Sequence, residues 1–250
     1  MYSQSPLTRF SDRSHDYARY RPSYPTAAID AIVQGFVGGA VAADIGAGTG
    51  ISARLLADRG LRVIAIEPNT AMAEAALPHP NVHYQAATAE QTGLETASID
   101  LVGCFQAFHW FEPEVSLVEF HRILKPQGRL VLVWNDRERS DPFTQAYSQL
   151  MKAASGDHPA NRHIESARPQ DVLENSLYFE QLHHAEFPYA QALSFEALLG
   201  RVRSSSYISL EENDLKILQD QLQELFEQWI NQNGEVDLKY RTHVYRVVAR

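Results

Sequence analysis

The chain has 250 residues, 44% hydrophobic and 21% charged, which is enough apolar content for one α/β domain with its own buried core. The formal net charge is −9, so the chain lacks the basic character with which proteins bind nucleic-acid phosphates, and we expect no nucleic-acid partner. The single cysteine, Cys104, excludes an internal disulfide and a four-cysteine metal site. No apolar run is long enough for a signal peptide or a membrane span, which predicts a cytoplasmic protein without a membrane partner.

Strand-like and helix-like segments alternate in the first half of the chain. A helix is expected at 25–36, and an apolar strand follows at 41–45. Further strands are expected at 62–67, 82–86, 99–105 and 130–134, separated by helices at 51–59, 70–76 and after Pro113. In the last of these helices, Val115, Val118, Ile123 and Leu124 are expected to form one apolar face. Unbroken apolar strands separated by helices are typical of a parallel sheet covered on both faces, so five parallel strands are expected within residues 40–136.

The segments after residue 136 are less regular. A helix is expected at 143–154, a polar loop at 156–169, a strand at 182–193 and a helix at 195–202. The sequence SLEE at 209–212 is a capping box. It precedes apolar residues that recur every three or four positions, which predicts an amphipathic helix at 211–230 in the core or at a dimer surface. An alternating pattern at 236–249 predicts a last strand.

The most informative motif is DIGAGTG at 44–50, between an expected strand and an expected helix. Glycines there let the backbone turn tightly and let a ligand approach the main chain. In a dinucleotide fingerprint the third glycine lies three residues after the second, where this chain has Ile51; its own third glycine is Gly50. Glu67 ends the next strand, where an acidic side chain can accept hydrogen bonds from both ribose hydroxyls of a nucleoside. Taken alone, Glu67 fits NAD as well as S-adenosylmethionine.

With its later motifs, the chain resembles the class I S-adenosylmethionine-dependent methyltransferases, and more narrowly their type 11, trans-aconitate methyltransferase-like group. The matching segments are DIGAGTG at 44–50, IEP at 66–68, AE at 89–90 with Leu94, IDLV at 99–102 and RILKPQG at 122–128. YARYRPSYP at 17–25 and QAFHWF at 106–111 resemble a subgroup of that family. The resemblance implies an α/β, Rossmann-like doubly wound sheet of seven strands. That sheet would be mostly parallel with an antiparallel C-terminal strand, with helices on both faces and extra helices near the C-terminus.

The resemblance also implies which residues hold S-adenosyl-L-methionine. Gly46 and Gly48 would line the methionine tail, Glu67 would hold the ribose, and Glu90 would lie beside the adenine. Thr88 stands where many relatives have Asp, so adenine recognition is expected to rest on backbone groups and Glu90. The full set of cofactor-binding candidates is Asp44, Gly46, Ala47, Gly48, Gly50, Glu67, Pro68, Ala89, Glu90, Phe105, Gln106, Tyr17, Tyr20 and Arg21.

The candidates for the methyl acceptor are Gln106, His109 and Trp110, because they follow the strand end where ligands of open α/β sheets bind. His109 is the candidate catalytic base. The alternative is a packed aromatic cluster around Phe108 and Phe111. Tyr17, Tyr20 and Arg21 are expected in an extended, mobile N-terminal cover over the sulfonium, with a solvated arm as the alternative.

We therefore expect one methyltransferase domain over 1–250, with a core at 26–136, an N-terminal arm at 1–25 and acceptor-side segments at 137–181 and 194–234. The expected reaction transfers a methyl group to a small-molecule acceptor, with carboxylic acids among the candidates. A non-catalytic S-adenosylmethionine-binding protein and an NAD-dependent oxidoreductase are the alternatives. The expected state is a monomer or homodimer. No metal is expected, because His158, His163, His183 and His184 lack the spacing of metal ligands.

Overall fold

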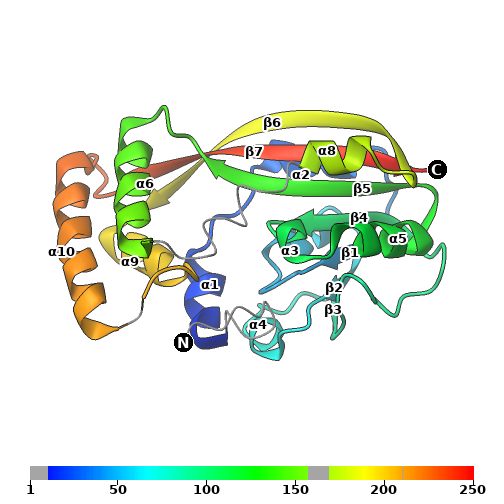
Figure 1. Ribbon diagram of the computed structural model, residues 1–250, viewed down its shortest axis with the longest axis horizontal. Coiled ribbons are helices and arrows are strands. Elements are labelled where there is room, and N and C mark those ends of the chain that lie inside the picture. The colour runs from blue at the N-terminus through cyan, green and yellow to red at the C-terminus, as the bar shows by residue number, and fades with distance from the viewer. Residues whose placement is uncertain (1–10, 157–168, 210) are drawn as a thin grey trace.

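The computed structural model describes residues 11–156, 169–209 and 211–250 (Figure 1). Most of the loop expected at 156–169, with His158 and His163, lies outside the described residues. Residues 1–10 of the expected arm and Leu210 of the expected capping box also lie outside them. In the described part of the chain, no helix combines the length and the apolar character needed to cross a bilayer.

Within the described residues, seven strands form one sheet in the order β3-β2-β1-β4-β5-β7-β6. They are β1 (Val41–Ile45), β2 (Arg62–Ile66), β3 (Val82–Gln85), β4 (Ile99–Phe105), β5 (Leu124–Arg137), β6 (Phe179–Leu193) and β7 (Val236–Ala249). Strands β1 to β5 pair in parallel, whereas β7 pairs antiparallel with β5 and β6. The expected fold class is therefore confirmed. The strand order reverses between β1 and β4, and ligands of such sheets bind outside the carboxyl ends of the strands at that point.

Helices cover both faces of the sheet. On one face, α2 (Thr26–Val33) and α3 (Ile51–Ala57) bury Ile29 and Leu56 in one apolar cluster. On the other, α5 (Pro113–Ile123) and α8 (Pro169–Glu174) bury Phe120 and Leu173 in a second. The short helix α4 (Thr70–Glu74) follows β2, and the one-turn helix η2 (Phe108–Trp110) follows β4.

Helix α5 buries a different face from the one expected. Val115 and Val118 are 51% and 46% exposed, so their assignment to the apolar face was wrong. The buried face instead carries Leu117, Phe120 and Ile123, three positions apart, which places them in one row along the helix. The expected face combined residues from two sides of the helix, because apolar type alone does not fix which side meets the sheet.

The N-terminal arm is largely helical where it is described. A one-turn helix, η1 (Ser11–Arg13), leads into α1 (Ser14–Tyr20), and the extended chain expected for this region occurs only after Arg21. Asp16 lies in the first turn and Arg19 in the last, which suits the dipole of the helix. The ring of Tyr20 lies directly over Gly200, where a Cβ atom would overlap it. Helix α1 therefore packs tightly against α9 (Phe195–Arg203).

Three long strands carry the C-terminal helices. Strands β5, β6 and β7 have 14, 15 and 14 residues, whereas β1 has five. At the far ends of the long strands, α6 (Pro142–Ser155), α9 and α10 (Glu212–Trp229) enclose a third apolar cluster that includes Tyr147, Leu198 and Phe226. Figure 1 shows these helices gathered with α1 at one end of the molecule, away from α5 and α8.

Candidate cofactor and acceptor site

The glycine loop between β1 and α3 is held in a conformation that other residues rarely adopt. Gly46, Gly48 and Gly50 have φ values of 70°, 55° and 73°. A Cβ atom on Gly46 would lie 2.7 Å from the Cβ of Ala107, just after β4, and one on Gly50 would overlap the Tyr84 hydroxyl. The loop thus packs closely against Ala107 and Tyr84, at the ends of β4 and β3, and leaves no room for a side chain at Gly46 or Gly50.

Glu67 connects the glycine loop to β2. Its carboxylate accepts hydrogen bonds from the Gly48 and Asn69 N–H groups, each at 2.8 Å, and the residue is only 9% exposed. Burial raises the pKa of Glu67, while the two backbone hydrogen bonds oppose that rise. Each carboxylate oxygen keeps a further acceptor position for a ligand.

Asp44 is buried at the carboxyl end of β1. The Ser52 hydroxyl donates to its Oδ2 at 2.6 Å, whereas Oδ1 has no hydrogen-bond partner within the described residues. Burial raises the pKa of Asp44 to about 7, and the nearby charge of Glu67 adds to the effect. A buried acceptor without a donor is costly, so this oxygen is suited to receive a ligand N–H group.

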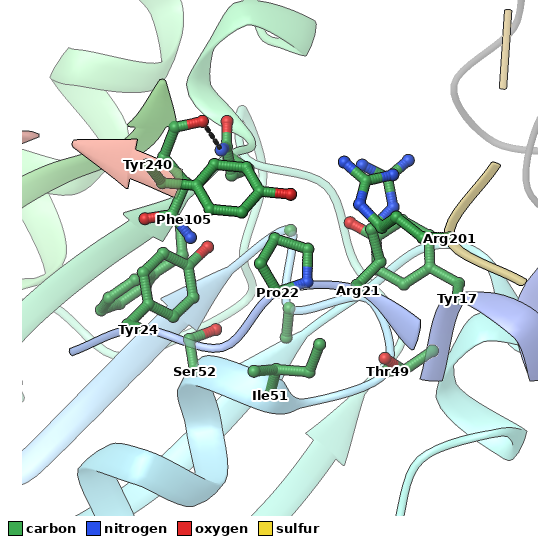
Figure 2. Close-up of a pocket in the computed structure, with 14 residues that line it drawn as sticks. Tyr17, Arg21, Pro22, Tyr24, Thr49, Ile51, Ser52, Phe105, Arg201 and Tyr240 are labelled. Carbon is green, nitrogen blue, oxygen red and sulfur yellow. Dashed lines mark hydrogen bonds between the residues drawn. The ribbon is translucent and has the colours of Figure 1, made fainter. Parts of the chain in front are cut away.

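A cavity in front of the glycine loop gathers residues from the arm, the loop, the ends of β4, β5 and β7, and α9 (Figure 2). Its lining is Tyr17, Arg21, Pro22, Tyr24, Gly46, Ala47, Thr49, Ile51, Ser52, Phe105, Gln106, Asn135, Arg201 and Tyr240. Six of these, Tyr17, Arg21, Gly46, Ala47, Phe105 and Gln106, are candidates that the sequence supplied. Arg201 and Tyr240, from distant segments, are not.

Gln106 has an unusual backbone at the end of β4. Its φ is 55°, a left-handed value that is uncommon outside glycine. Its N–H group donates to the Val133 carbonyl at 2.8 Å, and its side-chain amide donates to the Asn135 carbonyl at 3.1 Å. Such backbone strain clusters at functional sites, which supports Gln106 as a site residue.

The adenine-side candidates lie apart from this lining. Ala89 is buried, and Glu90 accepts a hydrogen bond from the Glu112 N–H at 3.0 Å, next to the start of α5. Pro68 stands between Glu67 and Asn69, and the Asn69 side chain caps α4. Their assignment to the adenine and the ribose stays a prediction.

Two tyrosines of the arm, Tyr17 and Tyr20, point in different directions. The Arg21 guanidinium lies 4.5 Å from the centre of the Tyr17 ring, and both residues line the cavity. The Tyr20 hydroxyl instead donates to Glu196 of α9 at 3.1 Å, outside the cavity lining. The described geometry therefore brings Tyr17 and Arg21 to the site but not Tyr20.

His109 and Trp110 are also outside the cavity lining. They lie in η2 with their ring centres 4.9 Å apart, beside the buried Phe108, which packs edge-on against Phe111. The aromatic packing that the sequence left as an alternative is thus present around Phe108. Roles for His109 and Trp110 toward the acceptor rest on the sequence alone.

Arginines and tyrosines gather at one side of the cavity, and three of them line it. This arginine–tyrosine cluster consists of Arg21, Arg137, Arg201, Tyr147, Tyr207 and Tyr240. Arg137 donates to the Tyr207 hydroxyl at 2.8 Å and lies opposite Tyr240 in the β5–β7 ladder. Burial alone would raise the pKa of Tyr207, but the charges of Arg137, Arg201 and Arg21 outweigh it and lower that pKa to about 8.

Two histidines and a glutamate meet on the exposed side of β6 and β7. His184, Glu186 and His243 place their ligand-type atoms within 4.8 Å of one another. His184 Nε2 and His243 Nδ1 are hydrogen-bonded to each other at 3.0 Å, and Glu186 also contacts Arg241 at 3.3 Å. These side chains are thus engaged with one another and with Arg241.

A family model described as a methyltransferase domain matches residues 43–132. An uncharacterized methyltransferase-like protein of Schizosaccharomyces pombe is 30% identical over 252 residues, covering 98% of this chain and 97% of the relative. An uncharacterized methyltransferase of Mycobacterium tuberculosis is 34% identical over 194 residues, covering 76% and 74%. A proposed type II methyltransferase from Anaeromyxobacter dehalogenans superposes with a TM-score of 0.66 at 25% identity, covering 92% of this chain and 97% of that one.

The fold and the glycine loop define a nucleoside-binding α/β domain of the methyltransferase type. Together with these relatives, they show that the chain belongs to the class I methyltransferase family, whose cofactor is S-adenosylmethionine. The phosphoethanolamine N-methyltransferase 2 of Haemonchus contortus, solved with S-adenosylhomocysteine, shares the fold with a TM-score of 0.57 at 16% identity over 96% of this chain and 58% of its own. The narrower trans-aconitate-like grouping stays a prediction.

Proposed function

We propose that this protein transfers a methyl group from S-adenosylmethionine to a small-molecule acceptor in the cavity lined by Arg21, Gln106 and Arg201. The observation that carries the proposal is the joint geometry of the glycine loop, Glu67 and Asp44. A glycine loop with left-handed turns, a carboxylate held against it and an unpaired buried carboxylate oxygen suit the three polar parts of that cofactor. The other residues of the cavity then orient the bound cofactor.

The residues of this chain fit the cofactor part by part. Glu67, already fixed by two backbone hydrogen bonds, is placed to accept the ribose hydroxyls. Asp44 Oδ1 is suited to the amino group of the methionine tail, and Arg21 to its carboxylate. Tyr24 and Phe105, with ring centres 5.0 Å apart, give the cavity an aromatic wall. Aromatic faces stabilise a neighbouring cation such as a sulfonium.

S-adenosylmethionine supplies a methyl group that is already activated by the positive sulfur. The protein therefore contributes mainly by aligning the acceptor with that methyl group and by excluding water. Tyr17, Arg21 and Pro22 of the arm cover the cavity, while Gln106 fixes the end of β4 beside it. An acceptor that is already a carboxylate needs no base, whereas a hydroxyl or carbon acceptor does, and His109 is the proposed base in that second case.

Calorimetric titration of the purified protein with S-adenosylhomocysteine, and separately with NAD, tests the cofactor. We expect binding of the first and none of the second; the reverse result would support an oxidoreductase. The protein is then incubated with S-adenosylmethionine and a panel of carboxylates, amines, phenols and nucleic acids, and mass spectrometry detects any methylated product. Transfer to a small molecule supports the proposal, whereas cofactor binding without transfer to any acceptor would support a non-catalytic binding protein.

A further inference from the structure

The arginine–tyrosine cluster holds three cations without an acidic partner, of which Arg201 is buried and Arg21 and Arg137 are half-buried. Among the described residues, no carboxylate lies within ion-pair distance of Arg21, Arg137 or Arg201; the ion pairs that form involve other basic side chains. Arg201 is 4% exposed. An unpaired buried charge is strongly unfavourable, so such a concentration of positive charge calls for an anion.

Arg13 shows what a purely structural buried arginine looks like in this molecule. It is 8% exposed, donates to the main-chain carbonyls of Ser205 and Ile208, and pairs with Asp12. Arg201 instead donates to the Ser204 and Ser205 hydroxyls, at 3.4 and 3.1 Å, and lies against the Tyr240 hydroxyl, while its Nε has no acceptor in the described structure. Such hydroxyls bring no compensating charge.

Arg21 and Arg137 also lack a carboxylate partner among the described residues. Arg21 donates to the Ser204 carbonyl at 2.9 Å, and its Nε has no acceptor within the described residues. Arg137 donates to the Tyr207 hydroxyl and stands 4.9 Å from the centre of the Tyr147 ring. The Tyr147 hydroxyl is buried without a partner among the described residues. Several hydrogen-bonding groups are thus available together with the charge.

The cluster opens toward the site of methyl transfer. Figure 2 shows Arg21 and Arg201 at the same end of the cavity, near Tyr17, with Tyr240 between them and the Tyr24–Phe105 wall. Both arginines line this cavity, and Arg137 lies close enough to Arg201 for their charges to interact. A molecule that reached the end of β4 from this side would meet the cluster directly.

The charge of the cofactor leaves the cluster unbalanced. S-adenosylmethionine carries a sulfonium and an ammonium but only one carboxylate, so its binding adds positive charge. If Arg21 takes that carboxylate, Arg137 and Arg201 still lack a counter-charge, and the sulfonium lies nearby. We infer that Arg137 and Arg201, with Tyr147, Tyr207 and Tyr240, bind an anionic methyl acceptor that carries at least one carboxylate or phosphate group. This assignment rests on the proposed function and specifies its substrate class.

Calorimetry on the protein saturated with S-adenosylhomocysteine tests the anion site. The probes are propane-1,2,3-tricarboxylate, glutarate and glycerol 3-phosphate, with propane-1,2,3-tricarboxamide as the neutral control, in a buffer free of carboxylate and phosphate. We expect at least one anion to bind, and Arg201→Gln or Arg137→Gln to weaken it at least 10-fold, as loss of a buried charge-assisted contact does. Arg203→Gln, an exposed arginine of the same helix, should leave the affinity within about threefold.

The affinity for S-adenosylhomocysteine, measured on every variant, reports whether it is folded and tests the cofactor separately. If Arg201→Gln does not fold, Arg201→Lys decides, since it keeps the charge but loses the two-pronged contact and should still weaken the anion. Binding of carboxylates alone or of glycerol 3-phosphate alone identifies the acidic group. The inference is overturned if no anion binds, if the neutral amide binds equally, or if the variants bind the anion as the wild type does. If S-adenosylhomocysteine fails to bind, the proposed function fails, and the same titrations on the free protein still test the anion site.

Discussion

At the scale of single residues, Glu67 gives the most direct test of the cofactor site. Glu67→Ala should weaken S-adenosylhomocysteine binding by about 1–3 kcal/mol, because charge-assisted hydrogen bonds to the ribose are lost. Glu74→Ala, an exposed glutamate on the following helix, is the matched control. Calorimetry on the three proteins measures the effect. Equal affinities in all three would remove Glu67 from the site.

The raised pKa of Asp44 predicts a particular dependence of stability on pH. In the folded protein the Asp44 carboxyl group stays protonated up to a pH of about 7. In the unfolded chain it loses its proton near its usual pKa of 3.8. Stability therefore falls as pH rises between about 4 and 7, by up to about 4 kcal/mol, and then levels off. Urea unfolding at pH 5 and pH 8 should show Asp44→Asn gaining stability relative to wild type at the higher pH. Asp237→Asn, an exposed control, should show no such gain.

His109 distinguishes the classes of acceptor. For an anionic acceptor that is methylated on a carboxylate, no base is needed, so His109→Ala should lower kcat less than 10-fold and leave cofactor affinity unchanged. His83→Ala, an exposed histidine on β3, is the control. Steady-state kinetics, once an acceptor is found, would contradict this if kcat fell by about 10²–10⁴, the range typical of a lost general base.

The residues at the cofactor end of the site could be predicted from the sequence, and the arginines at the acceptor end could not. Gly46, Gly48 and Glu67 lie in short motifs whose spacing reflects one local turn and the next strand end. Arg137 and Arg201 are 64 residues apart on a strand end and a helix, and neither belongs to a motif. Only the tertiary fold brings them together, so no sequence motif predicts that they are neighbours.

At the scale of elements, the contact between α1 and α9 depends on the absence of a side chain at Gly200. Gly200→Ala places a methyl group into the Tyr20 ring, so α1 must shift. We expect a loss of about 1–3 kcal/mol in stability, which Tyr20→Ala in the same chain should largely relieve. Denaturant unfolding of the two single variants and the double variant gives the coupling. Additive effects would show that the two helices are independent.

Elements were predicted well where periodicity and burial agree. Strand β4 was expected at its observed bounds, because all of its residues except Asp100 are buried and none of those is charged. Helix α1 was missed because it is rich in tyrosine and arginine and lacks an apolar periodicity. Its packing against Gly200 cannot be predicted from the sequence of the helix itself. Strand β5 was expected to end three residues early. Asn135 and Asp136 look like loop residues, yet antiparallel pairing with β7 keeps them in the strand.

At the scale of the whole molecule, the cavity lies between the sheet core and the cluster formed by α6, α9 and α10. We expect S-adenosylhomocysteine to slow amide exchange in residues 11–25 and in α9 together, because residues of the arm line the cavity and Tyr20 donates a hydrogen bond to Glu196 of α9. Peptides from α5, at the other end of the molecule, should not change. Exchange mass spectrometry with and without the ligand measures this. Equal protection in both states would make the arm a fixed element rather than a cover.

The bond from Arg21 to the carbonyl of Ser204 has a consequence for the order of events in turnover. The arm that covers the cofactor cavity is attached to the same segment that supplies Arg201 to the proposed anion site. We therefore expect a molecule beneath the arm to leave only after that attachment opens, and the opening to loosen the acceptor side as well. The two ligands are thus not exchanged independently. The cofactor is expected to enter first and its spent form to leave last, so the rate of turnover would follow the lifting of a short helix rather than the transfer itself.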